Sequence, residues 1–254
     1  MPQFETLQAG FLIATRTTAF LFLAPFFSIK GAPNLLKIIL GVYLALIILP
    51  GVAITGDLPA DMGRYSLLII KEAFVGIVLG LVCMLVFSAI RLAGEIIDFQ
   101  IGFSMASVLD PQNQTRITLI GQFMYMLGIL LFLVIDGHHS LLMALSYSFD
   151  LVPIEGAILK PGMSSVAVRT FIGMFLLGVM VAIPFITVLL ICDISLGMLA
   201  RTVPQINVFM LGFPMKVGLG LFTLMLALPI LITVISTILK QIEKDLVTVM
   251  GYMV

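Results

Sequence analysis

Long apolar runs alternate with short polar segments along the whole chain. A helix needs about 20 mostly apolar residues to cross a bilayer, and we expect six such spans. They cover residues 9–29, 38–55, 67–90, 117–135, 166–192 and 217–238. A further short apolar helix is expected over residues 140–149. The pattern therefore predicts an all-α, polytopic integral membrane protein, folded as a single membrane domain over residues 1–254.

The polar segment at residues 91–116 is too charged for a span and longer than an ordinary connector. Its front half has charged side chains at helical spacing, at Arg91, Glu95 and Asp98. Such positions share one face of a helix. Small residues follow Gly102, and the sequence at 110–113, Asp-Pro-Gln-Asn, is typical of a turn. We predict a helix that ends near Gly102, followed by an interrupted or re-entrant connector.

A second polar segment, residues 193–216, separates the fifth and sixth spans. It shares the weak pattern Asp-x-x-x-Gly with the first segment, here at Asp193 and Gly197. Interruptions at corresponding places in two halves of a chain often mark a site built from broken helices. We therefore predict a second interrupted connector. An ion-coupled secondary transporter is one class of protein that would use two such connectors.

Composition supports the membrane assignment. Hydrophobic residues make up 61% of the chain and charged residues 10%, which is too little charged surface for a soluble domain of this length. There are 13 basic and 13 acidic residues, so a nucleic-acid partner is not expected. With Arg16 left out, six Lys and Arg residues fall on each side of a six-span chain, which leaves its orientation undecided. We infer that orientation or final placement depends on partner subunits.

Arg16 lies in the middle of the first apolar run. A charge inside a membrane is costly and needs a partner. Glu72, or a carboxylate on another subunit, could be that partner. Alternatively, the first segment is not exposed to lipid, and Arg16 faces a hydrated interface between proteins. We favour the hydrated interface.

Glu95 and Asp98 have two interpretations. Two carboxylates on one helical face raise each other's pKa, so the pair could form a proton or cation site. Alternatively the face is solvated or ion-paired, because Arg91 lies one turn before Glu95. We favour the ion-paired face.

An enzymatic site is not expected. The stretch Gly-Phe-Ser-Met-Ala at 102–106 resembles the nucleophile motif G-x-S-x-G, with Ala at the last position. An intramembrane serine protease would need a histidine within hydrogen-bond reach of Ser104. The two histidines, His138 and His139, are expected together in a turn at the end of a span. Adjacent histidines on a helix point in different directions, so we do not expect both to bind one metal. We expect no cofactor and no metal.

Small and soft residues predict close packing between helices. Gly76 and Gly80 lie four residues apart in the third span, a spacing that lets helices approach closely. Further glycines in later spans indicate the same kind of packing, at Gly173, Gly178, Gly218 and Gly220. The chain also has 16 methionines, whose flexible thioethers fill irregular gaps or form a deformable seal.

Two strings carry a resemblance to a known family. LAGEIIDFQIGFSMASVLDPQNQ (92–114) and ARTVPQINVFMLGFPMKVGLGL (200–221) resemble the two signature regions of the FliR family. Members of this family are export-gate subunits of flagellar and virulence type III secretion systems, and the resemblance extends over essentially the whole chain. It implies a non-enzymatic subunit of a protein-export channel in the bacterial inner membrane, at the flagellar basal body.

The resemblance also implies partners. FliP-type and FliQ-type chains would assemble with this chain into a closed helical ring, and an FlhB-type switch subunit would wrap it. Unfolded export substrates would cross through the central channel. Membrane lipid is the remaining expected partner.

The resemblance further implies residue roles. A loop that plugs or lines the pore would contain Gly102, Phe103, Ser104, Met105, Leu109, Asp110, Pro111, Gln112 and Asn113. Contacts with neighbouring subunits would be made by Arg91, Glu95, Asp98, Arg201, Pro204, Gln205, Asn207 and Lys216.

Overall fold

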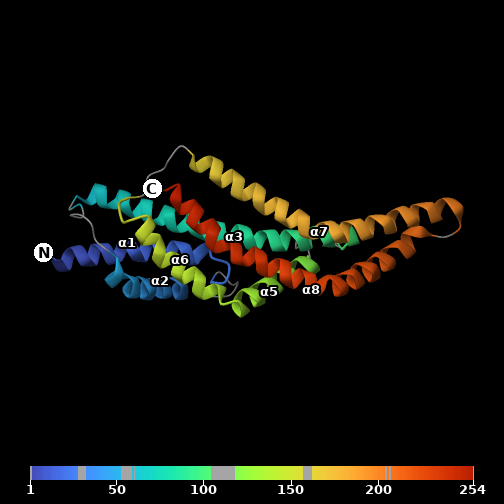
Figure 1. Ribbon diagram of the computed structural model, residues 1–254, viewed down its shortest axis with the longest axis horizontal. Coiled ribbons are helices and arrows are strands. Elements are labelled where there is room, and N and C mark those ends of the chain that lie inside the picture. The colour runs from blue at the N-terminus through green and yellow to red at the C-terminus, as the bar shows by residue number, and fades with distance from the viewer. Residues whose placement is uncertain are drawn as a thin grey trace. The chain divides into compact units, whose positions relative to one another are not determined.

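The computed structural model describes residues 2–27, 33–52, 59, 61–103, 118–156, 162–203, 205 and 207–253. All regular structure in these residues is helical (Figure 1). The helices are α1 (Pro2–Leu23), α2 (Asn34–Ile48), the 3-10 helix η1 (Leu49–Gly51), α3 (Met62–Ile101), α5 (Leu119–Val134), α6 (Gly137–Leu151), α7 (Met163–Thr202) and α8 (Val208–Gly251). The predicted all-α fold is confirmed for this part of the chain.

Five of the described helices are long and apolar enough to cross a membrane, and six spans result if α5 and α6 count as one broken span. This agrees with the six predicted spans. The short helix expected near residues 140–149 is α6. Between α5 and α6 lie Ile135 and Asp136, and Asp136 has a left-handed backbone with φ 56°. A non-glycine residue in that region interrupts the helix without a proline.

The second interrupted connector is much shorter than predicted. Helix α7 continues through Asp193 to Thr202, and α8 begins at Val208, so the break lies between these two helices only. Asp193 and Lys216, the charges that suggested an interruption, form an ion pair instead. Paired charges need not end a helix. Gly197 lies within α7, whereas Gly102 follows the end of α3, so the shared Asp-x-x-x-Gly pattern marks a helix end only at Gly102.

The chain forms two compact units. Unit 1 contains Met1–Val86, Asp136–Phe171 and Lys240–Val254, and unit 2 contains Phe87–Ile135 and Ile172–Leu239. Helices α3, α7 and α8 contribute to both units. That the chain acts as a single export-gate domain stays a prediction.

In unit 1, α1 packs closely against α2 and α3. A side chain at Gly76 would meet the main-chain oxygen of Arg16 and the methyl group of Ala19. At Gly80 it would meet Leu23, with 2.7 Å between the β-carbons. The predicted close approach at Gly76 and Gly80 is therefore confirmed. One cluster of buried apolar residues in this unit contains Ala9, Leu12, Ile13, Ala45, Leu68, Phe149 and Ile154.

Glycines also set the helix contacts of unit 2. A side chain at Gly178 would meet the Ala89 carbonyl oxygen at 3.0 Å, and one at Gly220 would meet the Ile101 side chain at 2.5 Å. These two predicted packing positions are confirmed. Gly173 and Gly218 have no described atom within 4 Å of an added side chain. They make no close contact within the described part of the chain, so packing of another chain at these two glycines stays a prediction.

Candidate functional site

The last turn of α3 is closed by a glycine in a conformation that most residues avoid. Gly102 has φ 100°, and its N–H donates to the main-chain oxygens of Asp98 (3.1 Å) and Phe99 (3.2 Å). The N–H of Phe103 donates to the same oxygen of Asp98, at 3.1 Å. This is the Schellman pattern, in which a left-handed glycine ends a helix and satisfies its last carbonyls. The predicted helix end near Gly102 is confirmed.

The side chain of Asp98 is buried and closes the start of α5. Its two carboxylate oxygens accept hydrogen bonds from the N–H groups of Ile120 and Gly121, each at 3.0 Å. These N–H groups lie in the first turn of α5, where they have no partner within their own helix. A negative charge there also suits the positive end of the helix dipole.

This geometry corrects two expectations for Asp98. Its side chain is 1% exposed, so it does not share the solvated, ion-paired face of Glu95. The reason is that α5, rather than solvent, covers this part of α3. The burial also leaves no exposed carboxylate for the predicted contact with a neighbouring subunit.

Asp98 reaches α5 because the two helices touch at a pair of glycines. A side chain at Gly94 would lie 2.5 Å from the α-carbon of Gly121 and 2.7 Å from its nitrogen. A side chain at Gly121 would lie 3.0 Å from the Glu95 side chain. The sequence reasoning missed both positions. The sequence features that could have indicated this contact are Gly94, one turn before Asp98, and Gly121, near the start of the next predicted span.

Polar and aromatic contacts join the end of α3 to α7 and α8. The Phe103 ring meets the Phe213 ring edge to face, with 6.4 Å between centroids. The Gln100 side-chain amide donates to Asp193 Oδ2 at 3.4 Å, and Lys216 Nζ lies 2.5 Å from Asp193 Oδ1. Lys216, predicted as a subunit contact, therefore has a partner within its own chain. Three helices meet at this polar bridge.

Arg91 and Glu95 form the predicted ion pair, with 2.9 Å between Arg91 Nε and Glu95 Oε1. Both side chains are exposed. The ion-paired interpretation is confirmed for Glu95, and subunit contacts by these two residues stay a prediction.

The residues predicted around the second break are only partly described. Arg201 is exposed in the last turn of α7, and Gln205 is exposed between the helices. Asn207 accepts a hydrogen bond from the Met210 N–H through its side-chain oxygen, at 3.3 Å, and so caps α8. Pro204 lies outside the described residues. So do most of the predicted plug residues: Ser104, Met105, Leu109, Asp110, Pro111, Gln112 and Asn113.

Arg16 is fully buried in unit 1 and has several partners. Its Nε donates to Glu72 Oε2 at 2.6 Å. Its Nη1 and Nη2 donate to the main-chain oxygens of Ser148 and Val152, at 2.9 Å each. The guanidinium also stacks over the Phe149 ring, 4.1 Å from its centroid. Glu72 was one of the two partners considered, whereas the favoured hydrated interface is wrong, because the protein itself surrounds the cation.

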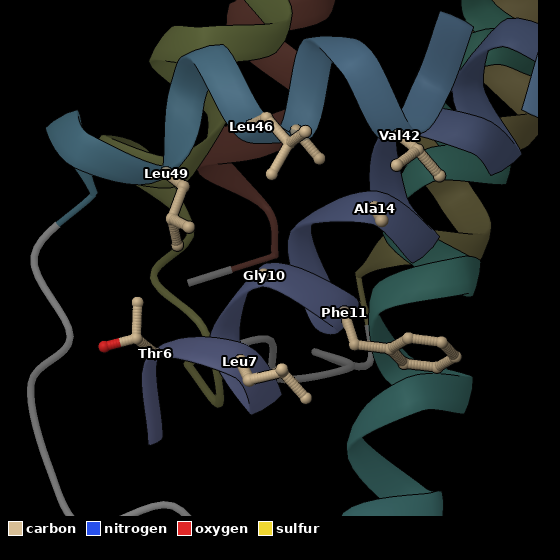
Figure 2. Close-up of a pocket in the computed structure, with 9 residues that line it drawn as sticks. Thr6, Leu7, Gly10, Phe11, Ala14, Val42, Leu46 and Leu49 are labelled. Atoms are coloured by element: carbon tan, nitrogen blue, oxygen red, sulfur yellow. The ribbon is translucent and has the colours of Figure 1, made fainter. Parts of the chain in front are cut away.

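An apolar groove of about 610 Å³ lies between α1 and α2 (Figure 2). Figure 2 shows Leu7 and Phe11 of α1 and Val42 and Leu46 of α2 at its walls. The remaining lining residues are Thr6, Gly10, Ala14, Ala45 and Leu49. Because no lining side chain is charged, the groove suits apolar contacts rather than the binding of an ionic solute.

No group of three or more His, Cys, Asp or Glu side chains that could hold a metal ion occurs among the described residues. His138 and His139 lie in the first turn of α6, not in the turn that the sequence suggested. Helix α6 begins earlier than expected, directly after the left-handed Asp136.

Comparison with known proteins places the chain in a family. The family model described as "Bacterial export proteins, family 1" matches residues 7–242. The chain belongs to this family, the FliR family. Flagellar biosynthetic protein FliR of Bacillus subtilis (strain 168) is 33% identical over 249 residues, covering 96% of each chain.

Two further relatives of this FliR-family chain are also named flagellar biosynthetic protein FliR. FliR of Pectobacterium carotovorum is 36% identical over 217 residues, covering 85% of this chain and 82% of the relative. FliR of Escherichia coli (strain K12) is 32% identical over 216 residues, with the same two shares covered. These relatives are named as flagellar biosynthetic proteins, not as enzymes. The family resemblance found in the two signature strings is confirmed.

Proposed function

We propose that this chain is a non-enzymatic subunit of the flagellar type III protein export gate, in the inner membrane at the flagellar basal body. With FliP-type and FliQ-type chains it forms a helical ring around the channel for unfolded export substrates, and an FlhB-type switch subunit contacts that ring. The observation that carries this proposal is the family match over residues 7–242, together with relatives named for flagellar biosynthesis.

The distribution of apolar surface supports an assembled gate. In an apolar 18-residue stretch of α7 and of α8, only 28% and 17% of the residues are buried within the described structure, against 56% in the corresponding stretch of α3. Apolar helix faces that the chain itself does not cover need lipid or apolar partner surfaces. The subunit contacts that we propose are the exposed residues Arg91, Arg201, Gln205 and Asn207, the half-buried residues Glu95 and Lys216, and Pro204.

Within the gate we assign the plug to residues 102–113. The support is that α3 ends at a capped Gly102 with Phe103 directly after it, so the chain leaves helical structure where the plug begins. Phe103 and Met105 would make an apolar seal that yields to a passing chain and stops ions by excluding water. Asp110 and Pro111 would direct the exit of the loop.

Co-expression with FliP-type and FliQ-type chains tests the assembly. We expect this chain to co-purify with both in one stable complex. A stable monomer that never joins such a complex would overturn the assignment. The rival class, an ion-coupled transporter, predicts that the chain purified alone moves an ion or solute in liposomes, whereas the export-gate proposal predicts no such activity.

Deletion of residues 104–110 tests the plug. We expect vesicles that contain the assembled complex to leak ions after this deletion, with export retained at least in part. The double substitution Phe103→Gly/Met105→Gly should act in the same direction, because it removes both apolar side chains. Unchanged conductance in both variants would contradict the plug assignment. Ser104→Ala, in contrast, should have little effect, whereas a serine protease would lose its activity.

A further inference from the structure

We propose that Asp98 is a positioning residue of the gate, which fixes the start of α5 to the end of α3. It would thereby set the two points between which the proposed plug segment is attached. This inference rests on the proposed function, because it gives Asp98 a part in keeping the channel closed.

Asp98 accepts hydrogen bonds at both ends of the segment that joins α3 to α5. The main-chain oxygen of Asp98 accepts the two hydrogen bonds that end α3, from Gly102 and Phe103 at 3.1 Å each. Its carboxylate accepts the two hydrogen bonds that begin α5, from Ile120 and Gly121 at 3.0 Å each. A displacement of Asp98 would therefore disturb both helix ends together.

No other described side chain closes the start of α5. Thr118 occupies the capping position, but its side chain makes no capping hydrogen bond. The carboxylate of Asp98 takes over this role from a neighbouring helix, and the contact between Gly94 and Gly121 brings it within reach. A buried, charged acceptor makes stronger hydrogen bonds than a neutral one.

Substitution of the Asp98 carboxylate by an amide tests its hydrogen bonds to α5. Asp98→Asn keeps the shape of the side chain, but one oxygen becomes an NH₂ group that only donates. That group would face a backbone N–H, so one of the two bonds to α5 is lost. We expect the population in which α5 is detached from α3 to rise roughly tenfold, as for the loss of a helix cap.

The experiment compares ion leak through vesicles that contain the complex of this chain with FliP-type and FliQ-type chains. Four forms are needed: the wild type, Asp98→Asn, the deletion of 104–110, and the two changes combined. We expect Asp98→Asn to assemble and leak more than the wild type. If Asp98 acts through the plug segment, the combined form should leak no more than the deletion alone.

The outcomes separate this inference from the proposed function. A deletion that does not leak overturns the plug itself. A deletion that leaks, with an assembled Asp98→Asn complex as tight as the wild type, overturns the role of Asp98 alone. Thr17→Val is the matched control, since it removes a buried hydrogen bond to the Gly41 carbonyl oxygen in unit 1. It should assemble without added leak.

A distance measurement supplies a readout that does not depend on the channel. Spin labels at the exposed positions Phe99 and Phe123, with both native cysteines replaced by alanine, report the separation of α3 and α5. Asp98→Asn should broaden the distance distribution and Thr17→Val should not. An unchanged distribution overturns the inference. So does failure of both Asp98→Asn and Asp98→Glu to assemble, because the residue would then be structural only.

Discussion

Two of the buried charged side chains, Arg16 and Asp98, satisfy backbone groups at helix ends. Asp98 accepts from N–H groups at the start of α5, and Arg16 donates to carbonyl oxygens at the end of α6. In each case the sign of the charge is the one that the helix dipole favours. Inside a membrane protein such groups cannot rely on water. A buried charge in a sequence like this therefore indicates a helix end nearby as readily as a transport site.

Replacing Arg16 tests whether this buried charge stabilises the chain by pairing with Glu72 and with the end of α6. Arg16→Met should destabilise the chain by about 3–5 kcal/mol, because it leaves the Glu72 carboxylate buried without its cation. The double variant Arg16→Met/Glu72→Leu should be less destabilised than Arg16→Met, since the unpaired charge is gone. It should not reach wild-type stability, because two carbonyl oxygens at the end of α6 still lack their donor. Unfolding by SDS in mixed micelles measures the free energies.

Thr187→Val serves as the control for this series. The Thr187 hydroxyl is exposed and donates only to a carbonyl oxygen of its own helix, that of Ile183. Its loss should change the free energy of unfolding by no more than about 0.5 kcal/mol. The single variant Glu72→Leu completes the series: if its effect and that of Arg16→Met simply add in the double variant, the ion pair contributes no coupling.

At the scale of the elements, glycine decides which helices meet. Gly76 fits against the backbone of α1, and Gly94 against the backbone of α5. Gly76→Ala should destabilise unit 1 by about 1–3 kcal/mol, because the new methyl group would overlap the Arg16 carbonyl oxygen. The same SDS titration measures this.

The matched change is Gly197→Ala in α7, where no described atom lies within 4 Å of an added side chain. Here the alanine should stabilise the helix by up to about 1 kcal/mol, through its higher helix propensity. The identical chemical change is thus expected to have opposite signs at the two positions. Equal effects would show that the close approach of α1 and α3 does not limit stability.

The sequence predicted the helices better than their contacts. Apolar runs predict the spans, and the spacing of Gly76 and Gly80 predicts a helix face that packs closely. Both predictions succeed because they depend only on residues near one another in the sequence. The predicted second connector is too long because Asp193 and Lys216 look like polar interruptions in the sequence, whereas they form an ion pair between two helices. Asp98 was placed on an exposed face because periodicity groups positions on a face without saying which helix covers it. Its partners, Ile120 and Gly121, lie far away in the sequence.

At the scale of the whole molecule, the described residues leave much apolar helix surface uncovered. Only 11% of the candidate span in α2 is buried within the chain, and the corresponding shares for α7 and α8 are also low. An apolar 18-residue stretch of α3, with 56% of its residues buried, is better covered than the corresponding stretches of α1, α2, α7 and α8. This distribution of burial is expected of a subunit whose helices contact lipid and other chains. The equal division of the Lys and Arg residues other than Arg16 also indicates that the placement of the chain depends on partner subunits.

The equal division of basic residues predicts that the chain alone inserts in both orientations. A reporter fused to the C-terminus should be active on both sides of the membrane when the chain is expressed alone, and on one side when FliP-type and FliQ-type chains are present. Glu155→Lys adds a cation to one set of loops, so it should shift the reporter ratio in the chain expressed alone, because cationic loops stay in the cytoplasm. Glu155→Gln, which adds no cation, should not. A single orientation of the unmodified chain without partners would contradict this dependence on assembly.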